Sequence, residues 1–260
     1  MLSLDKNFLL AKKAAHEAGN IVMKYFQTSS YEIKDKSYNN PVTTADYEAN
    51  QTIKDVLLQN GSSYGWLSEE TVDSKERLSK DYVWVVDPID GTKEFIEGVP
   101  QFSISIALVF KEEPILGIIY NPAKQELFSA CKGNGSFFNE EPTNCLKDNT
   151  KLTALVSRSE VKRGLWDKYV DRFDKLKPVG SVAYKLGLIG AAKADIFVTL
   201  RPKNEWDICA GHCIVNESGG VLVDLFGNPV KYNQKTTLIK PGLNSGSKDY
   251  VNSVLKIINT

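Results

Sequence analysis

The 260-residue sequence lacks an excess of charge of either sign and has few cysteines and histidines. Lys plus Arg and Asp plus Glu each number 32, so no net field attracts nucleic acid or an anionic membrane. Four cysteines without CxxC spacing are too few for a disulfide framework, which predicts reduced core thiols in a cytoplasmic protein. The two histidines, His16 and His212, show no zinc-ligand spacing.

Long apolar runs are also absent. No stretch approaches the ~20 residues that span a bilayer, and the N-terminus lacks the apolar segment and cleavage pattern of a signal peptide. We therefore expect no transmembrane segment. The longest candidate, Ile104 to Phe110, is interrupted by Ser105 and predicts a buried strand. The composition, 42% hydrophobic and 25% charged, is that of a globular protein large enough to bury a full core.

The apolar spacing predicts a mixed α/β chain. Apolar residues recur every three or four positions from Leu4 to Phe26, which predicts a helix with one buried face. Thr43, followed by Asp46, resembles a helix N-cap, and that helix should run to about Leu58. Strands, including one hairpin, are expected at 66–69, 82–87, 103–110, 115–120, 127–130 and 136–139.

The pattern changes near residue 150. We expect strands at 152–157, 195–200 and 220–224, and helices at 162–173, 183–193, 206–217 and 248–258. Residues 1–260 are therefore predicted to form one domain of two lobes. The first lobe, 1–150, would be α+β, and the second, 151–260, would be α/β.

An acidic segment, Asp87-Pro88-Ile89-Asp90-Gly91-Thr92, follows the strand Val83–Val86, which Pro88 is expected to end. Two carboxylates this close repel each other, and a hard cation such as Mg²⁺, bound by these oxygens and the Ile89 carbonyl, would remove the penalty. The alternative is a solvated Asp-rich turn. Gly91 and Thr92 stand at the start of a helical turn whose amides could bind phosphate, although Asp-Gly turns are common.

Further acidic residues are uninformative when taken singly. Glu69-Glu70 could be two exposed charges at the end of a strand. Asp46 and Asp207 could simply interact favourably with the dipoles of the helices that they begin.

Taken together, these residues resemble the inositol monophosphatase superfamily, the lithium-sensitive Mg²⁺-dependent phosphatases. The family's signature residues occur in the same order over nearly the whole chain: Asp46, Glu69-Glu70, Asp87 to Thr92, Trp206-Asp207 and Gly219-Gly220. The resemblance implies an α/β/α/β/α layered sandwich with a metal cluster between the two lobes. It also implies hydrolysis of a small-molecule phosphate monoester, a reaction that is very slow without a catalyst.

The resemblance also implies a role for each site residue. A cluster of two or three Mg²⁺ ions would be bound by Glu69, Asp87, the Ile89 carbonyl, Asp90 and Asp207. A metal-activated water near Glu69 and Thr92 would be the nucleophile, with Asp46 orienting the Thr92 hydroxyl. The substrate would contact Asp90, Gly91, Thr92, Gly180, Ser181, Lys185 and Asp207.

Three features resemble the CysQ-like 3′(2′),5′-bisphosphate nucleotidase branch. They are Lys93-Glu94-Phe95 after the acidic segment, Ser157-Arg158-Ser159, and Thr199 where inositol-specific enzymes usually carry a glutamate. The predicted reaction is hydrolysis of 3′-phosphoadenosine 5′-phosphate to AMP and phosphate.

Two departures favour other substrates. Glu160 replaces the histidine that nucleotidases carry after Ser-Arg-Ser, and the spacing from Gly180 to Lys185 resembles the inositol branch. The alternatives are an inositol-1-phosphate or fructose-1,6-bisphosphate phosphatase, or a non-catalytic protein that binds Mg²⁺ and nucleotide. Lys185 could contact a phosphate or be a solvated helix lysine, and Arg158 and Arg201 could face a second phosphate or lie on the rim. The resemblance is compatible with a homodimer.

Overall fold

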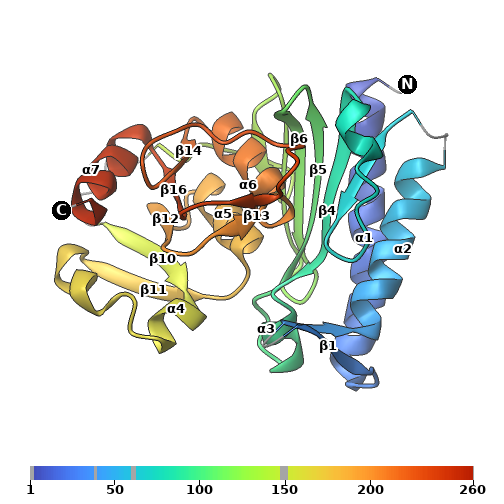
Figure 1. The fold of residues 1–260 in the computed structure, drawn as a ribbon, viewed down its shortest axis with the longest axis horizontal. Helices are drawn as coiled ribbons and strands as arrows, with labels where there is room; N and C mark the ends of the chain where they lie inside the picture. Colours follow the sequence, from blue (N-terminus) through green and yellow to red (C-terminus); the bar gives the residue numbers. More distant parts are fainter. Residues whose placement is uncertain (1–2, 38–39, 60–62, 147–151, 260) are drawn as a thin grey trace.

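The computed structural model describes residues 3–37, 40–59, 63–146 and 152–259. The chain forms alternating layers of helices and sheets, with the first two helices at one end and the last helix at the other (Figure 1). The predicted α/β/α/β/α sandwich is therefore confirmed. The predicted lobe boundary near residue 150 lies outside the described residues.

Helices α1 (Leu4–Thr28) and α2 (Thr44–Leu58) form the first layer, close to the predicted bounds. Helix α1 buries a stripe of small side chains that includes Ala11, Ala15 and Ala18. Helix α2 begins with the predicted capping box, in which Thr43 and Asp46 bond each other's backbone amides. Between the helices lies a hairpin that sequence patterns did not reveal, formed by β1 (Ile33–Ser37) and β2 (Asn40–Thr43).

The second layer is a seven-stranded sheet in which only the first two strands are parallel. In spatial order its strands are β3 (Gly65–Ser68), β4 (Tyr82–Asp90), β5 (Ser103–Phe110), β6 (Glu113–Asn121), β7 (Glu126–Cys131), β8 (Ser136–Phe138) and β9 (Glu141–Thr143). The short helices are η1 (Glu76–Ser79), which joins β3 to β4, and α3 (Thr92–Ile96), which follows β4.

The prediction that Pro88 ends its strand is wrong. Strand β4 continues to Asp90, and its pairing with β5 shifts register between Asp87 and Asp90. Pro88 therefore lies in an irregularity of the ladder, where its missing N–H removes no inter-strand bond. The irregularity holds both aspartates at one end of a buried strand.

Helices α5 (Val182–Gly190) and α6 (Glu205–Glu217) form the middle layer between the two sheets. Nearly all of α5 is buried, as expected of a core helix. Helix α6 approaches β6 so closely at Gly117 that a Cβ there would lie 2.3 Å from the Ala210 carbonyl oxygen.

The second sheet has five strands, and an outer helical layer covers it. Its strands, in spatial order, are β11 (Lys175–Val179), β10 (Thr153–Ser157), β12 (Ile196–Thr199), β16 (Leu243–Gly246) and β14 (Val221–Asp224). The remaining elements are α4 (Arg158–Lys162), η2 (Asp167–Arg172), α7 (Lys248–Ile258) and the short pair β13 (Lys203–Asn204) and β15 (Leu238–Ile239).

The predicted helix at 162–173 is wrong. Helix α4 ends before Gly164, whose φ of 71° breaks the helical path, and the 3₁₀ helix η2 follows. Strand β11 was not predicted; it is an edge strand, which is why it tolerates Pro178.

The four cysteines lie in described parts of the chain and are buried free thiols, as predicted. None of the described helices is long and apolar enough to cross a membrane.

We predict that Gly117→Ala destabilises the protein by about 1–3 kcal/mol, because the added methyl group must displace the backbone of α6. Urea unfolding measures this change. Val72→Ala, at a 95% exposed side chain, is the control and should alter stability by less than about 0.5 kcal/mol. A Gly117→Ala protein as stable as that control would contradict the close approach.

Candidate active site

Three carboxylates from separate elements converge between the layers. Glu69 follows β3, Asp87 lies within β4, and Asp207 lies in the first turn of α6. Each offers one oxygen, and these oxygens lie within 4.8 Å of one another. Residues far apart in the sequence thus form a compact, all-oxygen cluster.

The hydrogen bonding of Asp87 is incomplete. Its Oδ1 accepts a bond from the Ile89 amide at 3.1 Å, whereas its buried Oδ2 has no hydrogen-bond partner among the described residues. A buried carboxylate oxygen without a donor is costly, and neighbouring carboxylates cannot supply one while they are ionised. This donor set therefore fits a hard divalent cation that takes oxygen ligands.

Burial, together with the charges of neighbouring acids, raises the pKa values of Asp87, Asp90 and Asp207. Burial and the charges of Asp90 and Glu69 raise the pKa of Asp207 from 3.8 to about 8. Burial, followed by the charge of Glu69, raises the pKa of Asp87 well above its ordinary value. The Asp90 pKa is also raised by burial, although hydrogen bonds from Ser181 and Ala183 oppose the shift.

Asp46 links the start of α2 to the start of α3. Its Oδ2 accepts bonds from the Thr43 amide at 2.7 Å and hydroxyl at 2.6 Å, and its Oδ1 lies 3.1 Å from the Thr92 hydroxyl. Burial raises the Asp46 pKa to about 6, against the opposing effect of the Thr43 bonds. The Thr92 hydroxyl lies equally close, 3.1 Å, to the Ile89 carbonyl.

Gly91 has a φ of 99°, and a Cβ there would lie 3.1 Å from the Gln101 carbonyl oxygen. This left-handed conformation strains any residue with a side chain. It turns the chain sharply from β4 into α3, so Asp90 and Thr92 lie beside the same pocket.

Lys36 on β1 is a participant that the sequence did not reveal. Its Nζ lies 2.7 Å from Glu69 Oε1 and 2.6 Å from Glu70 Oε1. Burial lowers the pKa of Lys36, but the two glutamates outweigh that effect and raise it. Burial raises the Glu70 pKa to about 7. A cation bound by Glu69 would compete with this ammonium group.

Asp90 joins the acidic segment to the start of α5. Its Oδ2 accepts bonds from the Ser181 hydroxyl and the Ala183 amide, both at 2.6 Å. The Gly180 amide donates to Gln101 Oε1 at 2.8 Å. These contacts place the start of α5 directly opposite the acidic segment.

Lys185 is buried, so its interpretation as a solvated helix lysine is wrong. Its Nζ donates to the carbonyl oxygens of Val179 at 2.8 Å and Ser181 at 2.6 Å. Burial lowers the Lys185 pKa to about 8, although the charge of Asp90 opposes the shift. Lys185 nevertheless lines the pocket beside the acidic segment.

That pocket has a volume of about 330 Å³ and lies between elements of both sheets. Its lining includes the predicted site residues Glu69, Ile89, Asp90, Gly91, Thr92, Gly180, Ser181, Lys185 and Asp207. Asp46 and Asp87 lie behind this lining and contact it. Arg158 lines the pocket, whereas the exposed Arg201 does not.

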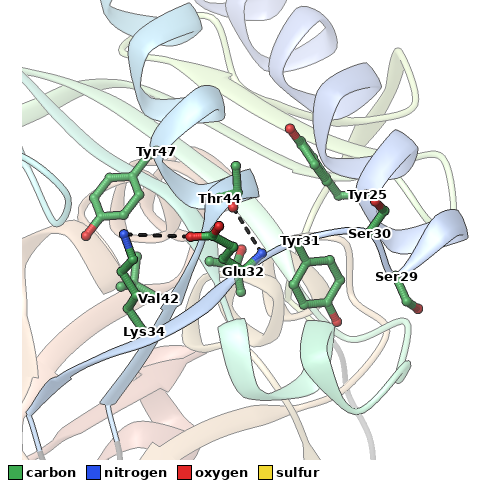
Figure 2. Close-up of a pocket in the computed structure, with 10 residues that line it drawn as sticks. Tyr25, Ser29, Ser30, Tyr31, Glu32, Lys34, Val42, Thr44 and Tyr47 are labelled. Carbon is green, nitrogen blue, oxygen red and sulfur yellow. Dashed lines mark hydrogen bonds and ion pairs between the residues drawn. The ribbon is translucent and has the colours of Figure 1, made fainter.

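A hollow of about 640 Å³ lies elsewhere, between the end of α1 and the β1–β2 hairpin (Figure 2). Figure 2 shows the aromatic rings of Tyr25, Tyr31 and Tyr47 around it. Its acidic side chain, Glu32, is 3.8 Å from Lys34 Nζ. Without a group of carboxylates this hollow offers no metal site, so the 330 Å³ pocket is the candidate active site.

Glu160 points away from the pocket, into the protein. Its carboxylate accepts bonds from Trp166 Nε1 at 3.0 Å, the Thr199 hydroxyl at 2.5 Å and the Leu200 amide at 3.2 Å. Glu160 stands where nucleotidases carry a histidine, and Thr199 stands where inositol-specific enzymes usually carry a glutamate. These two residues hydrogen-bond each other inside the protein. Glu160 therefore places no negative charge where a second phosphate would lie.

Arg158 joins the two sides of the pocket mouth. Its Nη1 lies 2.9 Å from Glu94 and its Nη2 lies 2.9 Å from Glu97. The arginine side chain is 34% exposed, so solvent screens these ion pairs and an anionic ligand can compete for the guanidinium group.

We predict that the metal-free protein loses stability as the pH rises from about 6.5 to about 8. In this range folded Asp207 still binds a proton that the unfolded chain, with a pKa of 3.8, has released. Burial lowers the pKa of His212 to about 4, so this residue makes stability rise with pH, but only below its ordinary pKa of 6.5.

Thermal unfolding with a chelator measures this decline. Asp207→Asn should reduce its slope, the exposed control Asp171→Asn should not, and excess Mg²⁺ should offset it. Metal-free protein whose stability rises over this pH range would contradict the raised pKa of Asp207.

Comparisons with known proteins agree with this geometry. The model of the inositol monophosphatase family matches residues 4–258. A Thermotoga maritima protein, fructose-1,6-bisphosphatase/inositol-1-monophosphatase, is 32% identical over 251 residues, which cover 95% of this chain and 93% of that protein. The 3′(2′),5′-bisphosphate nucleotidase CysQ of Escherichia coli strain K12 is 31% identical over 239 residues, or 88% and 94%.

The solved structure of a Thermotoga maritima IMPase matches with a TM-score of 0.82 and 30% identity, over 95% of this chain and 94% of that one. Relatives that act on different phosphate esters are thus about equally similar in sequence. The family match extends over nearly the whole chain, which belongs to the inositol monophosphatase family.

Proposed function

We propose that this phosphatase of the inositol monophosphatase family hydrolyses 3′-phosphoadenosine 5′-phosphate to AMP and phosphate in a Mg²⁺-dependent reaction. The main support is a second hollow of about 680 Å³ beside the active-site pocket. The two share Lys93, Glu94, Arg158 and Ser159 in their linings, so a ligand can extend from one into the other.

The second hollow suits a charged nucleotide. Four cations, Lys93, Arg158, Lys162 and Arg163, outnumber the two carboxylates, Glu94 and Glu97, in its lining, and Val161 and Pro178 add apolar surface. These cations can bind a second phosphate while the apolar surface contacts part of the nucleoside. A phosphate of a monophosphorylated inositol would fill the first pocket and leave this second group of cations unused.

In this proposal Glu69, Asp87, the Ile89 carbonyl, Asp90 and Asp207 hold two or three Mg²⁺ ions. When bound, Mg²⁺ neutralises charge on the attacking and leaving oxygens and lowers the pKa of water. The protein's part is to hold these oxygens at fixed positions on three elements. Asp90 Oδ2 accepts hydrogen bonds from Ser181 and Ala183, so Oδ1 would be the oxygen available to hold a cation.

Asp46 and Thr92 orient the attacking water. If the Thr92 hydroxyl donates its proton to Asp46 Oδ1, 3.1 Å away, its lone pairs are directed to accept a hydrogen bond from that water. Glu69 is the nearby carboxylate that can take the proton released when the oxygen attacks phosphorus. The phosphorus–ester oxygen bond breaks, and the nucleoside oxygen leaves as a hydroxyl group after it takes a proton from solvent.

Gly91, Thr92 and Lys185 bind the phosphate group that is cleaved. The amides of Gly91 and Thr92 lie at the start of α3, and glycine allows the ester to approach the backbone closely. The Lys185 ammonium group uses two of its three donors on carbonyl oxygens, and the described residues offer no third acceptor. Its remaining donor is therefore available to a phosphate oxygen.

Inositol 1-phosphate or fructose 1,6-bisphosphate is the second candidate. It is favoured by the spacing between Gly180 and Lys185 and by the similarity to the Thermotoga maritima protein. Comparison of kcat/KM on all three substrates with Mg²⁺ tests the proposal. We expect the bisphosphorylated nucleotide to be preferred by at least about tenfold, or ~1.4 kcal/mol. Preference for inositol 1-phosphate would overturn it, and binding of Mg²⁺ and nucleotide without phosphate release would indicate a non-catalytic protein.

Asp90→Asn is expected to lower kcat by more than about 100-fold without changing the thermal unfolding temperature much. The amide keeps the side-chain volume and one acceptor for Ser181, but loses a ligand charge. Phosphate release and circular dichroism provide the two readouts, with Asp171→Asn as an exposed control. Retained activity in Asp90→Asn would refute its role as a ligand.

Arg158→Met tests the second hollow. We expect kcat/KM for the bisphosphorylated nucleotide to fall about ten- to a hundredfold, because a charge-assisted hydrogen bond contributes ~1.5–3 kcal/mol. Hydrolysis of 3′-AMP, which lacks the second phosphate, should change much less. The control is Arg201→Met, whose arginine lies outside both hollows. Equal losses of kcat/KM on the two nucleotides would show that Arg158 does not bind the second phosphate.

A further inference from the structure

Arg77 is a buried arginine that takes no part in the site described above. It lies in η1, between β3 and β4, and its side chain is 1% exposed. The guanidinium group binds both oxygens of Asp73, with Nε to Oδ1 at 3.0 Å and Nη2 to Oδ2 at 2.8 Å. A buried charge is costly unless its donors are satisfied. The remaining hydrogen-bond partners of Arg77 therefore identify the part of the chain that it fixes in place.

Those partners belong to a loop distant in sequence. Arg77 Nη1 donates to Asn233 Oδ1 at 2.8 Å, and Nη2 donates to the Gln234 carbonyl at 2.9 Å. Asn233 Nδ2 in turn donates to the Arg77 carbonyl at 3.1 Å. The arginine thus fixes both the side chain and the backbone of this loop.

The loop then holds the start of α6. The amides of Asn233 and Gln234 donate to the two carboxylate oxygens of Glu205, at 2.6 and 2.8 Å. Glu205 is fully buried, and its own amide donates to the Thr237 carbonyl at 2.9 Å. The first residue of α6 is therefore fastened to the loop through its side chain and its backbone.

Asp207 lies in this same first turn. Its Oδ2 accepts the Asn204 amide at 2.9 Å in the capping box of the helix, so Asp207 is fixed within the turn that Glu205 attaches to the loop. The strands on either side of η1 deliver Glu69 and Asp87 to the acidic cluster. Arg77 consequently connects the strands that carry two of the carboxylates to the helix that carries the third.

We propose that Arg77 is a positioning residue of the metal centre. Through Asn233, Gln234 and Glu205 it sets where Asp207 stands relative to Glu69 and Asp87, and thereby the affinity for a divalent cation. The inference rests on the metal site of the proposed function and is independent of the substrate. If Arg77 had a purely structural role, its loss would change the stability of the fold but not the affinity for the metal.

Two variants test the proposal. Arg77→Met removes the guanidinium group. Asn233→Gly removes one link and keeps the backbone path, because Asn233 has a φ of 57° that glycine adopts readily. Val254→Ala, in a core cluster of α7, is the control for lost stability away from the site.

Mn²⁺ binding, followed by electron paramagnetic resonance without substrate, is the readout. We expect Arg77→Met to bind Mn²⁺ about tenfold more weakly than wild type, Asn233→Gly to be weaker in the same direction, and Val254→Ala to be unchanged. If Arg77→Met does not fold, Asn233→Gly decides. Variants that bind within about twofold of the Val254→Ala control would overturn the proposal.

Failure of the underlying metal site gives a different result. Wild-type protein that binds no Mn²⁺ would overturn the metal centre and this inference together. A wrong substrate assignment would leave Mn²⁺ binding and its dependence on Arg77 intact.

Discussion

Repulsion among buried carboxylates is the constraint on which the site depends. Asp87 and Asp90 lie on a strand of the first sheet and Asp207 lies on a helix packed between the two sheets, and these positions do not relax apart without disrupting that packing. Burial and mutual repulsion raise all three pKa values. The fold thus maintains an arrangement that is unfavourable by itself and that a cation stabilises. Lys36 supplies positive charge at one side of the same cluster, beside Glu69.

Much of the fold followed from apolar periodicity. Helices α1, α2 and α7 and the hairpin of β5 and β6 each present one regular apolar pattern, and the structure confirms them. Prediction failed where tertiary contacts or single residues outweighed that pattern. Gly164 ended a predicted helix, and the β1–β2 hairpin is too polar to show a strand pattern.

The site was less accessible to reasoning from residue types. Asp46, Glu69 and Asp207 each have an ordinary explanation in isolation, and only their order relative to the acidic segment indicated a common site. Charge and spacing could not reveal the direction of a side chain. Glu160 could have faced the pocket, but its bonds to Trp166 and Thr199 turn it inward. Lys36, in a polar hairpin without a motif, gave no signal at all.

The central claim is that Glu69, Asp87 and Asp207 form a cation site. A crystal structure of the protein with Mn²⁺, with anomalous diffraction measured at the manganese edge, tests it most directly. We predict an anomalous peak within coordination distance of all three carboxylates, with Asp87 Oδ2 among the ligands and Lys36 displaced from Glu69. Density that contains no anomalous peak there, with Lys36 still bonded to Glu69 at saturating Mn²⁺, would contradict the account.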